Sequence, residues 1–487
     1  MKLRDPKFKL QLPLSFFAAA LPFAVLLVFA SPAAGPAGAP SHAEVALDWP
    51  KINQEAIEKL SDYIRVDTSN PPGNEVRAAE WYEKIFDAEG ITYETAESAP
   101  GRGNVVARLK GTGNEPALIL LNHMDVVPVN REFWTVEPFG GIQRDGYICG
   151  RGAEDMKSIG IAQLIAFLEL HREHVPLRRD VIFLGTADEE AGGKFGAGWV
   201  VLNRPNWISG AGFLLTEGAH SRVDDKGRPI FFGVGPTEKT PGWLKLTATG
   251  RSGHGSIPIP DSAVNRLIAA LERLRNYRPP LEVTPPIESG LRSLAPYEAE
   301  PWRTRFLNLR EFVASPGAYD ELAKRRAILA LLTNTISITG LEGSKKVNVI
   351  PPSASALLDC RLLPSWTIER WRDQVRKIIH DDSIQIETVL NFASTASPVN
   401  TLLYADIRDA VKQLHPGAGV TQSIETGFTD SHFFRERNIV SYGFEPFAIP
   451  EADTARVHGN DERIPVKAYT DGVRLLWDVV YNFSRAE

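Results

Sequence analysis

The sequence is poor in the residues that build several common classes of protein. It has two cysteines in 487 residues, Cys149 and Cys360, which argues against a disulfide framework and a zinc-finger pattern. One bridge between them and two buried thiols both stay open. No block rich in lysine and arginine occurs and the formal net charge is -6, so nucleic acid is not an expected partner. Beyond the N-terminal region there is no second long apolar run, and we expect the body to be soluble.

The first 43 residues have the layout of an export signal. Four basic residues lie among the first nine, an uncharged apolar segment runs from residue 13 to 30, and a stretch rich in small residues follows. Ser41-His42-Ala43 is a candidate cleavage site. An uncleaved membrane anchor at residues 13–30 is the alternative, because 18 apolar residues are near the lower limit for a membrane span. We expect a secreted or periplasmic protein.

Helical and strand-like patterns alternate on both sides of a central region. Residues 50–240 alternate between the two patterns, and the alternation returns after about residue 395, which predicts an α/β sheet covered by helices. From Trp243 to about Leu390 the order is strand, helix, strand, strand, helix, strand, as in ferredoxin-like domains. A proline-rich, helical segment at about residues 279–333 is inserted after the first of these helices. We predict one α/β domain interrupted by a smaller one.

Acidic and histidine residues gather where predicted strands end. They are His123 and Asp125 after "ALILLN", Glu189 and Glu190 after "VIFLGTA", Glu217 after "GFLLT", and Asp155 before a predicted helix. In open α/β sheets, ligands bind at the carboxyl edge of the strands. Any single cluster could be a polar loop, but several acids and a histidine at one edge favour a metal site.

Metal chemistry accounts for these residue types. Zinc binds imidazole nitrogen and carboxylate oxygen, and two ions about 3.5–4 Å apart need a carboxylate that bridges them. In the Glu189–Glu190 pair, one carboxylate can hold a metal ion. The other, with a pKa raised by burial and by its neighbours, can act as a general base.

Five segments taken together resemble the M20 family of di-zinc metallopeptidases and amidohydrolases: "NHMDVVP", "GRGAEDMKS", "DEEAGG", "TEG" and "VHGNDERIP". The likeness covers the chain from about residue 50 onward and looks most like the carboxypeptidase S and secreted N-acyl amino acid hydrolase branch. It implies a catalytic domain with a mixed sheet flanked by helices, interrupted by a ferredoxin-like α+β lid/dimerisation domain. The predicted division is a signal peptide and linker at 1–43, the catalytic domain at 44–240 and 394–487, and the lid domain at 241–393.

The resemblance also implies a metal-ligand set. Asp155 would bridge two zinc ions in each subunit, with Co²⁺ or Mn²⁺ as substitutes. His123 and Glu217 would complete one site, and Glu190 and His458 would complete the other.

Three further roles follow from the same resemblance. Glu189 would be the general base that activates the bridging water, and Asp125 would hold His123 in its ligating tautomer. His254, in "TGRSGHGSIP", would polarise the substrate carbonyl, often in the active site of a partner subunit. A homodimer through the lid domain is therefore expected, with a monomer as the alternative.

The resemblance places further residues against the substrate. Asn348 and Arg361 lie in the segment that faces it, and the planar fork of Arg361 suits a carboxylate. A salt bridge within the lid domain is the alternative for Arg361. Gly427 and Thr429 are additional candidates, although Phe428 between them departs from a common family form with two glycines before the hydroxyl residue.

Together these features predict an exported, zinc-dependent hydrolase. Its reaction would be cleavage of the amide bond of an N-acyl amino acid or small peptide with a free C-terminal carboxylate. A dipeptidase or aminopeptidase of the same fold and a catalytically silent binding protein are the alternatives, and the intact metal-site residues argue against the silent protein. The sequence leaves open the acyl group and the preferred amino acid.

Overall fold

The computed structural model describes residues 45–393 and 395–486. The predicted export signal and its cleavage site at residues 1–43 lie outside the described residues. Within the described ranges, no helix has both the length and the apolar character that crossing a membrane requires.

In the described part of the chain, nine strands form a mixed sheet with the order β1-β2-β6-β3-β7-β17-β9-β16, and β8 pairs with β9. The inner strands β3 (Glu115–His123), β6 (Arg179–Thr186) and β7 (Ala211–Thr216) run parallel. They are apolar along most of their length, as expected for strands covered on both faces. The other strands are β1 (Tyr93–Glu97), β2 (Gly103–Leu109), β8 (Arg222–Val223), β9 (Pro229–Glu238), β16 (Gly419–Glu425) and β17 (Val440–Gly443).

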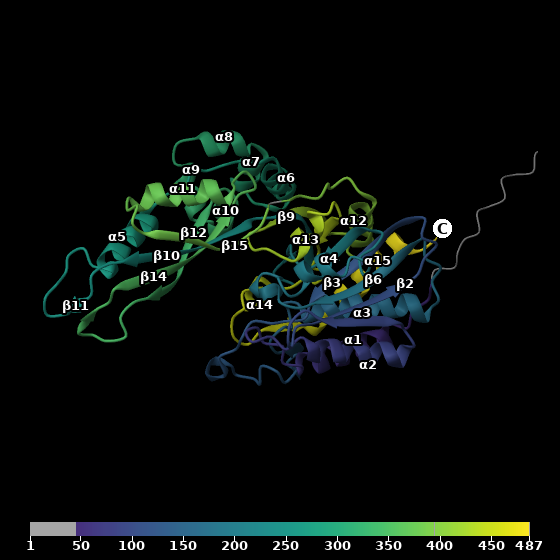
Figure 1. Ribbon diagram of the computed structural model, residues 1–487. Coiled ribbons are helices and arrows are strands. Elements are labelled where there is room, and N and C mark those ends of the chain that lie inside the picture. The colour runs from purple at the N-terminus through teal and green to yellow at the C-terminus, as the bar shows by residue number, and fades with distance from the viewer. Residues whose placement is uncertain (1–44, 394, 487) are drawn as a thin grey trace, which may run out of the picture. The chain divides into compact units, whose positions relative to one another are not determined.

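Helices cover both faces of this sheet (Figure 1). Along β3, Leu118 and Leu120 join one core cluster, whereas Ile119 and Leu121 join another, because successive strand residues point to opposite faces. The first cluster is formed with α1 (Trp49–Ile64), α2 (Val76–Glu89), α3 (Lys157–Arg172), α12 (Leu402–Leu414) and α15 (Val466–Ser484), and the second with α4 (Ala197–Asn203) and α13 (Ser431–Arg435). The predicted mixed sheet flanked by helices is confirmed.

A second sheet has a core of its own. Its antiparallel strands have the order β12-β14-β10-β15, and α5 and α11 pack against it. This is the strand-helix-strand-strand-helix-strand plan expected from the sequence. The elements are β10 (Thr240–Thr249), α5 (Ala263–Asn276), β12 (Thr335–Glu342), β14 (Ser353–Leu362), α11 (Ile368–Ile379) and β15 (Gln385–Asn391).

The segment inserted after α5 folds into short helices around a separate apolar cluster. Its first helix, α6, lies along β16 of the large sheet, since Ser289 Oγ donates to Gln422 Oε1 at 2.7 Å and the Gln422 amide donates to Ser293 Oγ at 2.9 Å. The helices are α6 (Pro285–Leu294), α7 (Trp302–Leu307), α8 (Leu309–Ala314), α9 (Ala318–Ala323) and α10 (Arg326–Leu331).

Several short elements complete the described structure. β4 (Ile142–Arg144), β5 (Tyr147–Cys149) and β18 (Arg463–Pro465) form a small sheet, and β11 (Gly253–His254) pairs with β13 (Val349–Ile350). α14 spans Glu451–Thr454, and 3₁₀ turns lie at Arg131–Phe133, Glu189–Ala191 and Ala295–Tyr297.

Candidate metal centre

His123 is the last residue of β3 and is almost completely buried, with 3% of its surface exposed. Its Nδ1 lies 3.0 Å from the backbone oxygen of Asp125. A proton on Nδ1 would be donated to that oxygen, which leaves Nε2 free to act as a ligand. Nε2 lies 3.2 Å from Asp155 Oδ1 and 3.3 Å from Glu217 Oε1.

Asp155 presents its two oxygens to two different histidines. Oδ1 faces His123, and Oδ2 lies 2.9 Å from His458 Nε2, which is also 3.3 Å from Glu190 Oε2. The structure therefore brings all five predicted ligands together, in two groups that share Asp155. A carboxylate that bridges two metal ions requires this arrangement.

The donor set fits a pair of zinc ions, because each group combines an imidazole with carboxylates. Burial, reinforced by the nearby charge of Asp155, raises the pKa of Glu190 to about 7. Burial also raises the pKa of Glu189 well above its usual value, with a further contribution from Glu217. Clustered acids with raised pKa values repel one another when ionised, and bound cations would remove that repulsion.

Two histidines lie against these acids. Hydrogen bonds with Asp155 and Glu190 raise the pKa of His458 to about 10. Burial alone would raise the pKa of Asp155, but hydrogen bonds from His123 and His458 outweigh burial and hold that pKa well below its usual range. Asp155 is thus the carboxylate of the cluster most strongly favoured in its ionised, ligating form.

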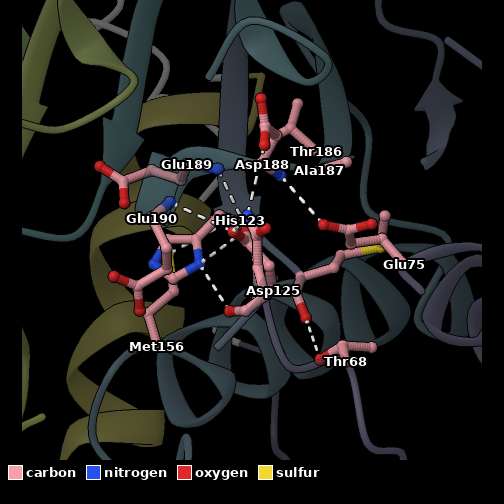
Figure 2. A network of polar contacts seen from close by, with 12 residues as sticks. Thr68, Glu75, His123, Asp125, Met156, Thr186, Ala187, Asp188, Glu189 and Glu190 are labelled. Carbon is pink, nitrogen blue, oxygen red and sulfur yellow. Dashed lines mark hydrogen bonds and ion pairs between the residues drawn. The ribbon is translucent and has the colours of Figure 1, made fainter. Parts of the chain in front are cut away.

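Asp125 organises both the histidine and the acidic pair (Figure 2). Its carboxylate accepts hydrogen bonds from the backbone amides of Glu189 and Glu190, both at 3.1 Å, and from Asn70 Nδ2 at 2.8 Å. Its backbone oxygen is the partner of His123. The residue predicted to orient one ligand therefore also holds the turn that carries Glu190 and the proposed base.

Asp188, the first of three consecutive acids, has a structural role. It adopts a left-handed conformation with φ 70°, and its carboxylate accepts hydrogen bonds from the Phe195 amide at 3.0 Å and from Asn70 Nδ2 at 3.3 Å. Its own amide donates to Glu75, which binds Arg102. These contacts direct the following two glutamates toward Asp125 and the metal-ligand cluster.

A cavity of about 510 Å³ opens onto the cluster. Its lining includes Glu189 and four of the five predicted ligands, namely Asp155, Glu190, Glu217 and His458. The predicted substrate residues Gly427 and Thr429 lie in the same wall. The Thr429 hydroxyl donates to buried Glu238 at 3.0 Å, so it is held within the wall.

Arg361 lines this cavity and is also held by a salt bridge. Its Nε and Nη2 donate to the two carboxylate oxygens of Asp359 at 2.7 and 3.1 Å. The guanidinium carbon lies 5.6 Å from the ring centre of Trp243 and 5.2 Å from that of Phe428. The third nitrogen, Nη1, has no hydrogen-bond partner among the described residues. Features of both alternatives for Arg361 are thus present, a salt bridge and an unpaired nitrogen.

His254 and Asn348 are not brought to the metal centre within one chain. They lie beside each other, because the Gly255 amide donates to the Asn348 backbone oxygen at 2.8 Å. His254 is exposed and its Nδ1 contacts Ser256 Oγ at 2.8 Å. Neither residue is in the cavity lining. Their predicted roles stay predictions, with a partner subunit as the expected site of His254.

Sequence reasoning did not single out three residues around the cavity. Asp359 lies two positions before Arg361 in β14, and residues two apart in a strand share a face, so the spacing alone could have predicted their pairing. Glu425 is the last residue of β16 and lines the cavity, so it carries the same strand-end signal as the other acids. Trp243, inside β10, has no comparable signal.

Comparisons with known proteins agree with this geometry. Residues 119–482 match the sequence profile of peptidase family M20/M25/M40. The chain is 30% identical to the N-fatty-acyl-amino acid synthase/hydrolase PM20D1 of Xenopus tropicalis over 89% of this chain and 86% of that protein. It is 29% identical to aminoacylase-1 of Sus scrofa over 86% and 93% of the two chains.

Solved structures show the same fold. An M20 family metallo-carboxypeptidase from Sulfolobus solfataricus superposes with a TM-score of 0.67 at 18% identity, covering 88% of this chain and 98% of that chain. Human carnosine dipeptidase 1 gives a TM-score of 0.67 at 16% identity over 89% and 98%. Because the family profile matches most of the chain, this protein belongs to peptidase family M20/M25/M40.

Proposed function

We propose that this M20 hydrolase cleaves the amide bond of N-acyl amino acids, or of small peptides, that carry a free C-terminal carboxylate. One observation carries the proposal: Asp155, on the wall of a cavity, directs its two oxygens at two separate histidine–carboxylate groups. The names of the relatives support the substrate class, since they include an N-fatty-acyl-amino acid synthase/hydrolase and an aminoacylase.

The ligand residues divide between two divalent ions. His123 and Glu217 would hold one ion, His458 and Glu190 the other, and Asp155 both. When bound, such a pair supplies an activated water and polarises the substrate carbonyl.

Glu189 has the environment of a general base. Burial raises its pKa, which suits a group that takes a proton from the attacking water and returns it to the leaving nitrogen. Its carboxylate also lies within 4.8 Å of ligand atoms of His123 and Glu217, so proximity alone would equally allow it to be a ligand. The two roles differ in what Glu189→Gln does to the metal content.

Arg361 supplies the contact for the substrate carboxylate. Among the described residues, Nη1 is the one nitrogen of the guanidinium without a hydrogen-bond partner, and it is buried. The rings of Trp243 and Phe428 flank the group. A carboxylate held there would lie in the same cavity as the metal ligands.

The function is tested by a hydrolysis screen of N-acyl amino acids, dipeptides and amino-acid amides, with metal content measured on the same sample. We expect turnover of acyl amino acids and about two metal ions per chain. Turnover of amides but not of acyl amino acids would favour an aminopeptidase. Absence of turnover with both metals bound would favour a binding protein.

Two variants separate the base from a ligand. Glu189→Gln should keep both metal ions and lose most of the turnover, typically about 10²–10⁴-fold for general acid–base catalysis. Glu190→Gln, the matched control at the next position, should lose metal. Loss of metal in Glu189→Gln would mean that Glu189 is a ligand, and full activity at full occupancy would mean that it is not the base.

A further inference from the structure

Two of the predicted ligands stand on loops that meet at one end of the small sheet of β4, β5 and β18. Asp155 lies in the loop that follows β5, and His458 lies in the loop that precedes β18. Cys149, the last residue of β5, pairs with Arg463, the first residue of β18. Antiparallel pairing therefore places the two loops side by side, but it ends before either ligand is reached.

Glu462 holds the loop that carries Asp155. Its Oε1 accepts hydrogen bonds from the backbone amides of Glu154 at 2.8 Å and of Asp155 at 3.1 Å. Its backbone oxygen accepts from the Gly150 amide at 2.9 Å. One residue of the His458 loop thus binds the backbone of the proposed bridging ligand directly.

Arg151 holds the other loop. Its Nη1 donates to Glu462 Oε2, and its Nη2 donates to the backbone oxygen of Gly459 at 2.7 Å. Gly459 directly follows His458 in the chain. Two nitrogens of one planar guanidinium therefore connect Glu462, which binds the Asp155 loop, with the residue next to His458.

The pair is buried and separate from the first group of ligands. The side chains of Arg151 and Glu462 are 2% and 0% exposed. Within the described ranges, no hydrogen bond or ion pair joins either residue to His123 or Glu217. A buried ion pair is weak evidence for stability, since replacing both partners by apolar groups is often neutral or stabilising. The contacts of this pair point to a positional role at the second group of ligands, which includes His458.

We propose that Arg151 and Glu462 are positioning residues, which set the spacing between Asp155 and His458 and thereby favour binding of the ion that these two ligands share with Glu190. The inference rests on the division of the ligands between two ions in the proposed function, but not on its substrate class. Removal of the partners that orient metal ligands typically costs about 10- to 100-fold in metal affinity. The other ion, which the pair reaches only through Asp155, should be affected much less.

The test compares the two zinc dissociation constants of the metal-free protein, measured by calorimetry against a competing chelator. His458→Ala identifies the constant that belongs to the second site. Glu462→Gln keeps the shape of the side chain and removes its charge, and Arg151→Met removes the charge of the partner.

Glu238→Gln is the matched control for the loss of a buried ion pair. Glu238 pairs with Arg435, and their side chains are 5% and 3% exposed. In the described part of the chain, neither residue has a hydrogen bond or ion pair with a predicted metal ligand.

In the native protein we expect about two zinc ions per chain. Glu462→Gln and Arg151→Met should raise the dissociation constant of the second site by about 10- to 100-fold and that of the first site by less than about threefold. Glu238→Gln should change neither constant.

Two further variants separate positioning from stability. Arg151→Lys keeps the charge, but a single ammonium replaces the two-armed guanidinium, so it should restore zinc affinity only partly. The double variant Arg151→Met/Glu462→Gln leaves no unpaired charge buried. It should therefore recover the thermal stability that either single variant loses, while its second zinc ion stays weakly bound. This double variant also decides the test if a single variant fails to fold.

An unchanged second-site constant in folded Glu462→Gln, equal weakening of both ions, or native zinc affinity in the double variant would overturn the inference. A native protein that binds one ion would overturn it together with the division of ligands in the proposed function. Two bound ions with selective loss in Glu462→Gln, but no hydrolysis of any acyl amino acid or peptide, would support this inference while the proposed substrate class fails.

Discussion

Arg361→Ala should weaken the hydrolysis of substrates with a free carboxylate, and the structure sets the size of the loss. A hydrogen bond to a charged group is worth about 1.5–3 kcal/mol, which corresponds to about 10- to 150-fold at 1.4 kcal/mol per decade. Nε and Nη2 of Arg361 already bind Asp359, and only Nη1 has no partner within residues 45–393 and 395–486. Since a single hydrogen bond is weaker than a bidentate pair, we expect a loss near the lower end, about tenfold.

The assay is kcat/KM for one acyl amino acid and its C-terminal amide, in native, Arg361→Ala and Arg361→Lys proteins. The amide lacks the charge, so it should be a poor substrate for the native protein and should lose much less on mutation. Lysine should restore the acid preference only partly, because its ammonium is a point charge.

The amide also serves as the internal control for structural damage. Arg361→Ala breaks the pair with Asp359 and removes the contacts with the rings of Trp243 and Phe428. If acid and amide substrates lose activity equally, the effect is structural. If the native protein handles both substrates equally well, the carboxylate is not recognised, and an aminopeptidase that binds a free amine becomes the better explanation.

Four further outcomes are expected. Asp155→Ala should lose metal from both sites, measured by elemental analysis, and loss from one site alone would show that Asp155 is not the bridge. Asp180 accepts three hydrogen bonds that outweigh its burial and lower its pKa. Its stabilisation is therefore present above the unfolded pKa of about 3.9 and is lost as the pH falls through the lower folded value. Asp180→Asn should accordingly lower the urea midpoint of unfolding at about pH 7 and lower it much less at about pH 3. An equal decrease at the two pH values would refute the link between the pKa of Asp180 and stability. The mature protein should begin near Glu44, and N-terminal sequencing that finds Met1 on membrane-bound protein would favour the anchor. If the protein is a homodimer in which His254 serves the partner's site, mixing His254→Ala with Glu189→Gln subunits should recover part of the activity, and monomers by light scattering would contradict the dimer.

Three of the acidic and histidine clusters could be predicted from the sequence because they follow strand ends, whereas the roles of Asp155 and His458 came from the family resemblance. His123 ends β3, Glu189 and Glu190 follow β6, and Glu217 follows β7, and parallel strands bring their carboxyl ends to one sheet edge. The alternation that predicted the two sheets is likewise local. The strand-end positions and the alternation both involve residues that are close together in the chain, so one sequence is enough to predict them.

The surroundings of the ligands depend on contacts between distant segments. Asn70 reaches Asp125 across 55 positions, and Ser289 of α6 reaches Gln422 of β16 across 133. The sequence predicted a helical insert at about residues 279–333, but periodicity within a helix does not specify which strand it covers. The packing of α6 on β16 could therefore not be predicted from the pattern of the insert.

Asp125 connects the fold to the chemistry more directly than a ligand does. Hydrogen bonds from His123, Asn70 and the backbone amide of Glu190 outweigh burial and lower its pKa, so it stays ionised at neutral pH. One charged side chain thereby joins the end of β3 to the turn after β6. This connection uses backbone groups and needs no metal ion, so the ligands at both strand ends are oriented by the folded chain itself. The ligand side chains then lose less conformational freedom when a metal ion binds, and this smaller entropic cost favours tight binding.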